Sequence, residues 1–285
     1  MSGMPAGNTV RALAGGGELR LVDAHVHVHA CFETAAFLDA AAGNLARGAA
    51  ALGLPADGGC LALTESAGAR WFQRCAAGEI ATGGWALAPT SEPGSLLALR
   101  EATTLALVAG RQVVTRERIE VLALCCPEAP PDGLPACEAI ERVRAAGGIP
   151  VLPWGFGKWW FARRALVARL ARGCGPLFLG DNGGRPRVGP DPALFARARA
   201  VGVPVLPGSD PLPFPREQDR GGRSGFVLPR PLDLRAPAAS LREQLLALAR
   251  DGRQPQPFGA GERLVRFAAL QVAMQLRRHA PGTAR

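Results

Sequence analysis

The stretch "LVDAHVHVHACF", residues 21–32, is the most informative part of this chain of 285 residues. It begins as an apolar strand and places Asp23, His25, His27 and His29 at alternate positions. Alternate residues of a strand point to the same face of a sheet, so these four side chains should lie together. The chain has only four histidines, and the fourth lies close to the C-terminus. This clustering of a scarce residue predicts a specialised site at the end of the first strand.

Strand-like apolar runs alternate with helix-like runs rich in Ala, Leu and Arg along the rest of the chain. Further strands are expected at "GCLALTES", "RIEVLALCC", "IPVLPWGFG", "PLFLGDN" and "VPVLPGSDPLPFP", and residues 82–115 should hold one or two more. Such alternation predicts a parallel sheet covered by helices. Because about 250 residues is typical of a TIM barrel, we expect an α/β fold of the (β/α)7–8 TIM-like barrel kind. An open doubly wound sheet is the alternative.

The chain shows no linker, repeat or low-complexity segment that would divide it. We therefore expect one barrel domain over residues 19–285, preceded by a short flexible tail over residues 1–18. No apolar run is long enough to cross a membrane, and the N-terminus lacks the pattern of a signal peptide. These features predict a cytoplasmic protein. The closing helix near residues 261–279 has apolar residues at helical spacing, which we expect to face the core, with a subunit interface as the alternative.

The formal net charge of +9 raises the question of an anionic partner. Nucleic-acid binding is disfavoured, because the arginines are scattered, no basic block is interleaved with aromatic residues, and tyrosine is absent. Arginine also recognises small carboxylates and phosphates. We expect a small anionic molecule as the partner, and no membrane; homo-oligomer formation stays open.

Polar side chains follow most of the expected strands, where the active site of a barrel lies. Two imidazoles placed two residues apart on a strand can both bind one divalent ion. The D-x-H-x-H pattern is therefore better explained by a metal site than by a merely polar strand face. The other polar strand ends contribute Glu65, Glu92, Glu128, Trp154, Lys158, Asp181, Asn182, Arg185 and Asp210.

"VDAHVHVH" resembles the opening motif of the amidohydrolase superfamily and of the related PHP and TatD-like hydrolases. In those families the H-x-H pair supplies two metal ligands, and an aspartate after the last strand binds the metal and acts as general base. "PGSDPLP" places Asp210 at the matching position. The resemblance implies a metal-dependent hydrolase of C–N or phosphoester bonds. It also implies one or at most two divalent ions (Zn, Mn or Fe), bound by His25, His27 and Asp210, with Glu65 or Asp181 as a further ligand.

The same resemblance implies roles for the remaining polar residues. Asp210 would accept the proton of the activated water, and Lys158 or Arg185 would neutralise developing negative charge. Lys158 is the only lysine of the chain, which suggests that arginine cannot replace it there. Asp23 and His29 would support the metal ligands through hydrogen bonds. The residues expected to bind the substrate are Trp154, Asp181, Asn182 and Arg223.

The chain departs from this family pattern in its middle. The pattern expects further histidines after middle strands, and none lies between His29 and His279. The bridging lysine or glutamate of the family could correspond to Lys158, Glu65 or Glu128. A second hypothesis follows from this departure: a catalytically degenerate barrel that binds an anionic ligand without metal.

Overall fold

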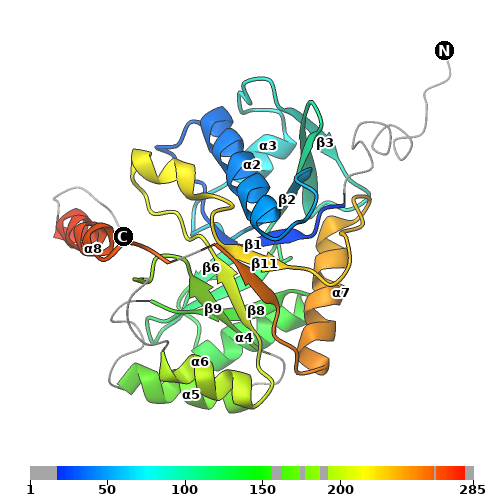
Figure 1. The fold of residues 1–285 in the computed structure, drawn as a ribbon. Helices are drawn as coiled ribbons and strands as arrows, with labels where there is room; N and C mark the ends of the chain where they lie inside the picture. The colour runs from blue at the N-terminus through cyan, green and yellow to red at the C-terminus, as the bar shows by residue number, and fades with distance from the viewer. Residues whose placement is uncertain (1–17, 156–161, 174–176, 187–191, 260, 280–285) are drawn as a thin grey trace.

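The computed structural model describes residues 18–155, 162–173, 177–186, 192–259 and 261–279, which form two β-sheets with helices around them (Figure 1). The larger sheet has seven strands in the order β12-β11-β1-β2-β5-β4-β3. Their bounds are β1 (Leu21–Val26), β2 (Gly58–Leu63), β3 (Ala86–Pro89), β4 (Ser95–Arg100), β5 (Thr103–Val108), β11 (Gly225–Val227) and β12 (Gln256–Phe258).

The smaller sheet has five strands in the order β10-β9-β8-β7-β6. Strands β7, β8, β9 and β10 match strands that the sequence predicts, and β6 lies in the region 82–115, where one or two strands were expected. Their bounds are β6 (Arg111–Val114), β7 (Glu120–Leu124), β8 (Ile149–Pro153), β9 (Phe178–Asn182) and β10 (Val205–Gly208).

The helices are α2 (Thr34–Ala51), α3 (Trp71–Ala76), α4 (Ala136–Ala145), α5 (Ala162–Gly173), α6 (Ala193–Ala200), the 3-10 helix η1 (Pro215–Arg220), α7 (Pro237–Arg250) and α8 (Leu264–His279). Three apolar clusters hold the sheets and helices together. One lies between the two sheets and includes one face of α7, a second lies under α2 and α3 on the larger sheet, and a third lies under α4, α5 and α6 on the smaller sheet.

The prediction of a TIM-like barrel was wrong, although the α/β class is confirmed. The strands form two separate sheets, and several neighbours are antiparallel: β3 with β4, β4 with β5, β6 with β7, and β7 with β8. The region 82–115, expected to hold one or two strands, contributes β3, β4, β5 and β6. Only two residues connect β4 to β5. A parallel pair needs a crossover of about a dozen residues or more, so such a short turn imposes an antiparallel hairpin.

The ends of β1 and β10 lie against each other. The backbone N–H of Asp210 donates to the carbonyl oxygen of His25 at 2.8 Å. Gly208 permits this approach, because a Cβ at that position would lie 2.5 Å from the Cβ of His25. This contact brings the first-strand histidines next to the aspartate that follows β10.

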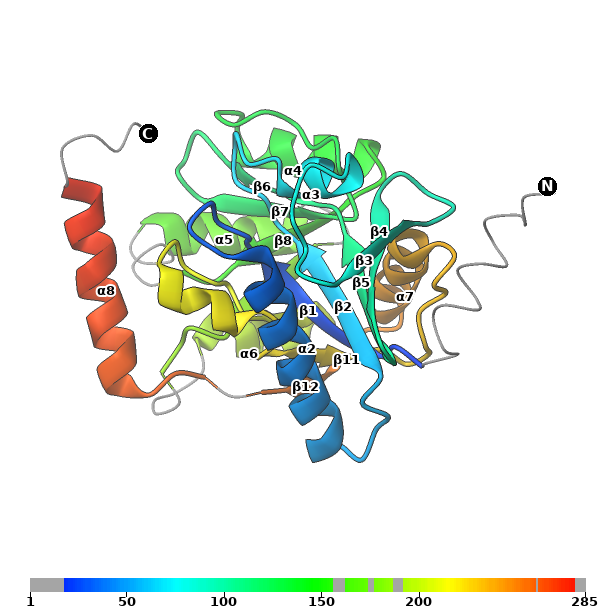
Figure 2. The same cartoon turned by 90° about the horizontal axis from the view of Figure 1, so that it is seen from above.

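Helix α8 flanks the rest of the molecule in both views (Figure 1, Figure 2). Along residues 264–276 none of its side chains is buried, and Val265 is 81% exposed. The core face expected for this helix is therefore not found in that segment. No helix among the described residues is long and apolar enough to cross a membrane. All but the last residue of the expected N-terminal tail lies outside the described residues.

Candidate metal centre

Three side chains converge where β1 and β10 end. His25 belongs to β1, His27 follows it directly, and Asp210 lies just beyond β10. The His25 and His27 Nε2 atoms are 3.1 Å apart. Asp210 Oδ1 lies 3.5 Å from the former and 3.7 Å from the latter. Within the described parts of the chain, these residues form the one cluster of at least three His, Cys, Asp or Glu side chains able to share an ion.

The size and chemistry of this cluster fit a divalent metal ion. In a tetrahedral zinc site with bonds of about 2.1 Å, ligand atoms lie about 3.4 Å from one another. The three observed separations, 3.1, 3.5 and 3.7 Å, lie on either side of that value. Two imidazole nitrogens and one carboxylate oxygen are ligands that zinc, iron and manganese accept. Three protein ligands leave further coordination positions for water or substrate.

His27 has the ionisation state that metal binding requires. Burial, together with the nearby His25, lowers its pKa to about 3, against the opposing effects of Asp210 and a side-chain hydrogen bond with Gln112. The imidazole is therefore neutral near pH 7, as a metal ligand must be. Gln112 comes from β6, in the region 82–115 where one or two strands were expected, but no sequence pattern marked it as a partner of His27.

Asp210 is held in place by its neighbours. Asn182 Nδ2 donates to Asp210 Oδ2 at 2.7 Å, while Asp210 Oδ1 faces the two histidines. The backbone of Asp210 has a φ of 46°, a left-handed conformation that aspartate tolerates better than most residues. His29 Nε2 lies 2.9 Å from the carbonyl oxygen of Pro211, the next residue. Asn182, expected to bind substrate, thus contacts a candidate metal ligand, and its role in substrate binding stays a prediction.

Asp23 is buried and accepts hydrogen bonds mainly from the backbone. The N–H groups of Ser209 and Gly222 donate to it at 2.8 Å, that of His25 donates at 3.1 Å, and the Ser209 hydroxyl also donates. Burial raises its pKa to about 6, against the opposing effect of these bonds. Asp23 therefore ties β1 to the residues after β10 and η1. The described contacts place it on the backbone around the ligands rather than on an imidazole nitrogen.

Glu65, expected as a metal ligand, lies elsewhere. Its Oε1 accepts from the backbone N–H of Phe72 at 2.9 Å, at the start of α3, and burial raises its pKa. It is not part of the cluster formed by the two histidines and Asp210. Its buried carboxylate holds the first turn of a helix.

The cationic residues expected at the site also have other partners. Arg185 forms a two-pronged ion pair with Asp181, with both N–O distances at 2.7 Å. Arg223 Nη1 lies 3.3 Å from Glu262 Oε1. Lys158 lies outside the described residues. The expected roles of these residues in charge neutralisation and substrate binding stay predictions.

Asp210 lines a small pocket of about 60 Å³. Trp154 and Asn182, both expected at the site, line it together with Arg220. Another part of the wall comes from α8, through Phe267, Leu270 and Gln271. No pattern in the sequence predicted that the last helix would lie beside the metal ligands.

A buried ionic network lies behind this pocket. Arg220 Nη1 is 3.1 Å from Glu262 Oε1, and Arg220 also donates to the carbonyl oxygen of Ser209, the residue before Asp210. Arg266 of α8 pairs with Glu217 at 2.8 Å and with Glu262 at 3.2 Å. The network connects α8 to the metal ligands. Charged residues in a loop and a closing helix look like ordinary surface residues in sequence, so this network was not predicted.

No protein-family model matches the chain, and no curated protein matches it either. Several solved structures are similar, among them two with a TM-score of 0.49 each. PsfC from Pseudomonas syringae PB-5123 is 18% identical, over 91% of this chain and 97% of that protein. The lesion-specific endonuclease PfuEndoQ from Pyrococcus furiosus is 14% identical, over 80% of this chain and 56% of that protein. Similarity this low does not bear on function, which has to be argued from the site.

Proposed function

We propose that this protein is a metal-dependent hydrolase acting on a small anionic substrate, with a divalent ion bound by His25, His27 and Asp210. The observation that carries the proposal is the convergence of three ligand atoms, none more than 3.7 Å from another, from two strand ends. A further ligand from Glu65 is not part of this proposal, because that carboxylate holds α3. One ion is therefore expected.

The residues of the site would have separate roles in metal binding and proton transfer. When bound, the ion would lower the pKa of a water molecule and polarise the bond to be cleaved. The two histidines, of which His27 is neutral, would hold the ion. The Asp210 side chain is 19% exposed, and its Oδ2 accepts a hydrogen bond from Asn182. Because Asp210 lines the small pocket, it could accept a proton from a water molecule there.

Elemental analysis of the purified protein tests this proposal. We expect about one divalent ion per chain in the wild type and none in the His25→Ala/His27→Ala double variant. The matched control is His279→Ala, which removes the one histidine outside residues 25–29. Metal-dependent hydrolysis is measured with bis(4-nitrophenyl) phosphate and 4-nitrophenyl acetate. Equal, near-zero metal in all three proteins after incubation with Zn²⁺, Mn²⁺ and Fe²⁺ would rule the proposal out.

One observation supports a second candidate. The 3.1 Å distance between the His25 and His27 Nε2 atoms is also that of a hydrogen bond. A metal-free site of this kind would hold a proton between the two imidazoles and bind an anionic ligand without hydrolysing it. It predicts no metal uptake, whereas ligand binding would persist in the metal-free wild type.

A further inference from the structure

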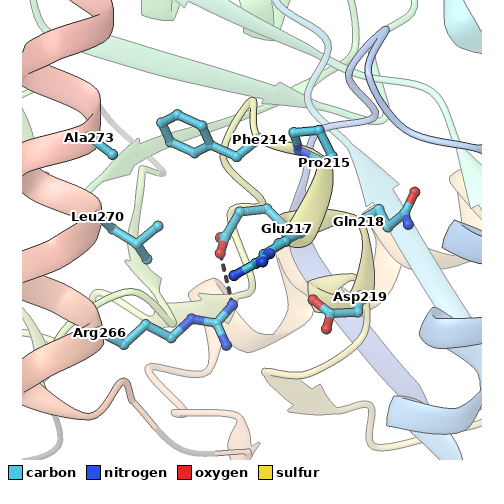
Figure 3. Close-up of a pocket in the computed structure, with 9 residues that line it drawn as sticks. Phe214, Pro215, Glu217, Gln218, Asp219, Arg266, Leu270 and Ala273 are labelled. Carbon is cyan, nitrogen blue, oxygen red and sulfur yellow. Dashed lines mark hydrogen bonds and ion pairs between the residues drawn. The ribbon is translucent and has the colours of Figure 1, made fainter.

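A groove of about 730 Å³ lies between η1 and α8 (Figure 3). Phe214 and Pro215 form one apolar side of it, and Leu270 and Ala273 of α8 form the other. This volume is within the range of about 300–1,000 Å³ that small-molecule sites occupy. The small pocket beside Asp210 is an order of magnitude smaller, at about 60 Å³, so a substrate of ordinary size needs further space.

The groove adjoins the small pocket that contains Asp210. Glu217 and Leu270 line both spaces. The carboxylate of Glu217 is fixed by Arg266 and by Arg220, so it forms a rigid divider. Leu270 is only half-buried on a helix without buried side chains along residues 264–276. A molecule lying in the groove can therefore extend past Leu270 toward Asp210.

The charges around the groove favour an anionic ligand. Arg216 is exposed, lines the groove, and forms no ion pair with any described residue. Arg266, by contrast, is paired with Glu217 and Glu262. Taken together, the groove and the network behind it hold four arginines (Arg216, Arg220, Arg223 and Arg266) against three carboxylates (Glu217, Asp219 and Glu262). The excess positive charge is that of Arg216.

We propose that this groove is the substrate cleft of the metal site, and that it takes an anion with a flat apolar body. The anionic group would lie against Arg216, and the body would lie between Phe214 and Leu270. The bond to be cleaved would extend through the small pocket toward Asp210. This inference rests on the proposed function, to which it adds the class of substrate.

Isothermal titration with phenylphosphonate, a flat apolar body joined to an anion, tests the cleft on the metal-loaded protein. Methylphosphonate, which has the anion without the body, is the matched probe. We expect phenylphosphonate to bind the wild type at least about tenfold more tightly than methylphosphonate. Arg216→Gln removes the cation and Leu270→Glu replaces an apolar wall with a negative charge, and each should weaken phenylphosphonate binding by about tenfold or more. Neither residue is a candidate metal ligand.

Arg197→Gln is the control variant. Arg197 is also an exposed arginine without an ion pair among the described residues, but it lines a different groove, between α5 and α6. Its substitution should leave the binding constant unchanged. Equal weakening by Arg197→Gln and Arg216→Gln, or no effect of Leu270→Glu in a protein with wild-type circular dichroism, would overturn the proposal.

The link to the metal site is tested with bis(4-nitrophenyl) phosphate. Leu270→Glu should raise KM about tenfold while the metal content stays at the wild-type level, and phenylphosphonate should inhibit competitively. A wild type that binds metal and hydrolyses this ester, but whose KM is unaffected by Leu270→Glu, would overturn the cleft alone. A wild type without metal would remove the proposed function, and the elemental analysis would distinguish that outcome.

Discussion

Asp23 shows how one buried carboxylate can organise a site without touching the ligand that would occupy it. Its four hydrogen bonds come from residues on three separate segments of the chain: His25, Ser209 and Gly222. The position of His25 relative to Asp210 depends on these bonds. The spacing in the sequence predicted that Asp23 would support the histidines. It could not predict that the bonds would run to the backbone, because Ser209 and Gly222 are about two hundred residues away.

The buried carboxyl of Asp23 predicts a dependence of stability on pH. Its pKa is raised from 3.8 to about 6 in the folded protein, so the folded state binds more protons than the unfolded state between about pH 4 and 6. The contribution of this carboxyl to the free energy of unfolding is fully present below about pH 4 and is lost as the pH rises through 6. Asp23→Asn cannot titrate.

Chemical denaturation of the metal-free wild type and of Asp23→Asn measures this effect. Between pH 4 and pH 6, the free energy of unfolding of the wild type should fall by about 2 kcal/mol relative to the variant. A change of the opposite sign would show that the hydrogen bonds to Asp23 outweigh its burial.

Asn182 should act on the metal through Asp210. Asn182→Ala removes the donor to Asp210 Oδ2 and frees the carboxylate to rotate. Loss of such a supporting contact typically lowers metal affinity by about 10–100-fold. Competition with a fluorescent zinc chelator measures this affinity.

The control for Asn182→Ala is Asn44→Ala, which removes an amide that donates to the carbonyl oxygens of Asp219 and Gly221. It should leave zinc affinity within about twofold of the wild type, since Asn44 contacts no candidate ligand. Equal losses of zinc affinity in the two variants would mean that a general increase in the flexibility of the protein, rather than the orientation of Asp210, controls zinc affinity.

At the scale of elements, the candidate ligands come together because β10 lies alongside β1. The sequence predicted both strands and the residues at their ends, which is why His25, His27 and Asp210 could be named in advance. The sequence did not identify three other residues near the site, Gln112, Arg220 and Glu262. Gln112 belongs to β6, one of four strands in the region 82–115, where only one or two were expected. Arg220 and Glu262 are charged residues whose burial depends on tertiary contacts.

The contact between β1 and β10 depends on Gly208. A Cβ there would meet the Cβ of His25 at 2.5 Å, and neither atom can rotate away. Gly208→Ala should therefore lower the free energy of unfolding by about 1–3 kcal/mol and weaken metal binding as β10 shifts. Thermal unfolding and elemental analysis measure both effects.

Gly173→Ala provides the comparison, because a Cβ at this helical glycine would meet nothing within 4 Å. It should leave metal content unchanged and stabilise the protein slightly, by up to about 1 kcal/mol. If Gly208→Ala behaved in the same way, the close approach of the two strands would not be needed for the site.

At the scale of the whole molecule, the alternation of strands and helices correctly indicated an α/β protein. It could not distinguish one closed barrel from two sheets. That difference was decided by short connections, such as the turn at Glu101 and Ala102, which force antiparallel pairing. Apolar runs of similar length and composition occur in parallel and antiparallel strands alike, so the direction of each strand was not contained in its own sequence.

Helix α8 completes the groove without contributing a buried side chain over residues 264–276, and this has a consequence for dynamics. Few buried contacts oppose local unfolding, so its amides should exchange with deuterium far faster than those of α2, which has six buried residues. A ligand that contacts α8 must then bind molecules in which α8 is folded in preference to molecules in which it is locally unfolded. Saturating phenylphosphonate should slow exchange in α8 and leave α2 unchanged, as mass spectrometry of peptides from the two helices would show. Unchanged exchange in α8 would mean that the helix is not part of the binding surface.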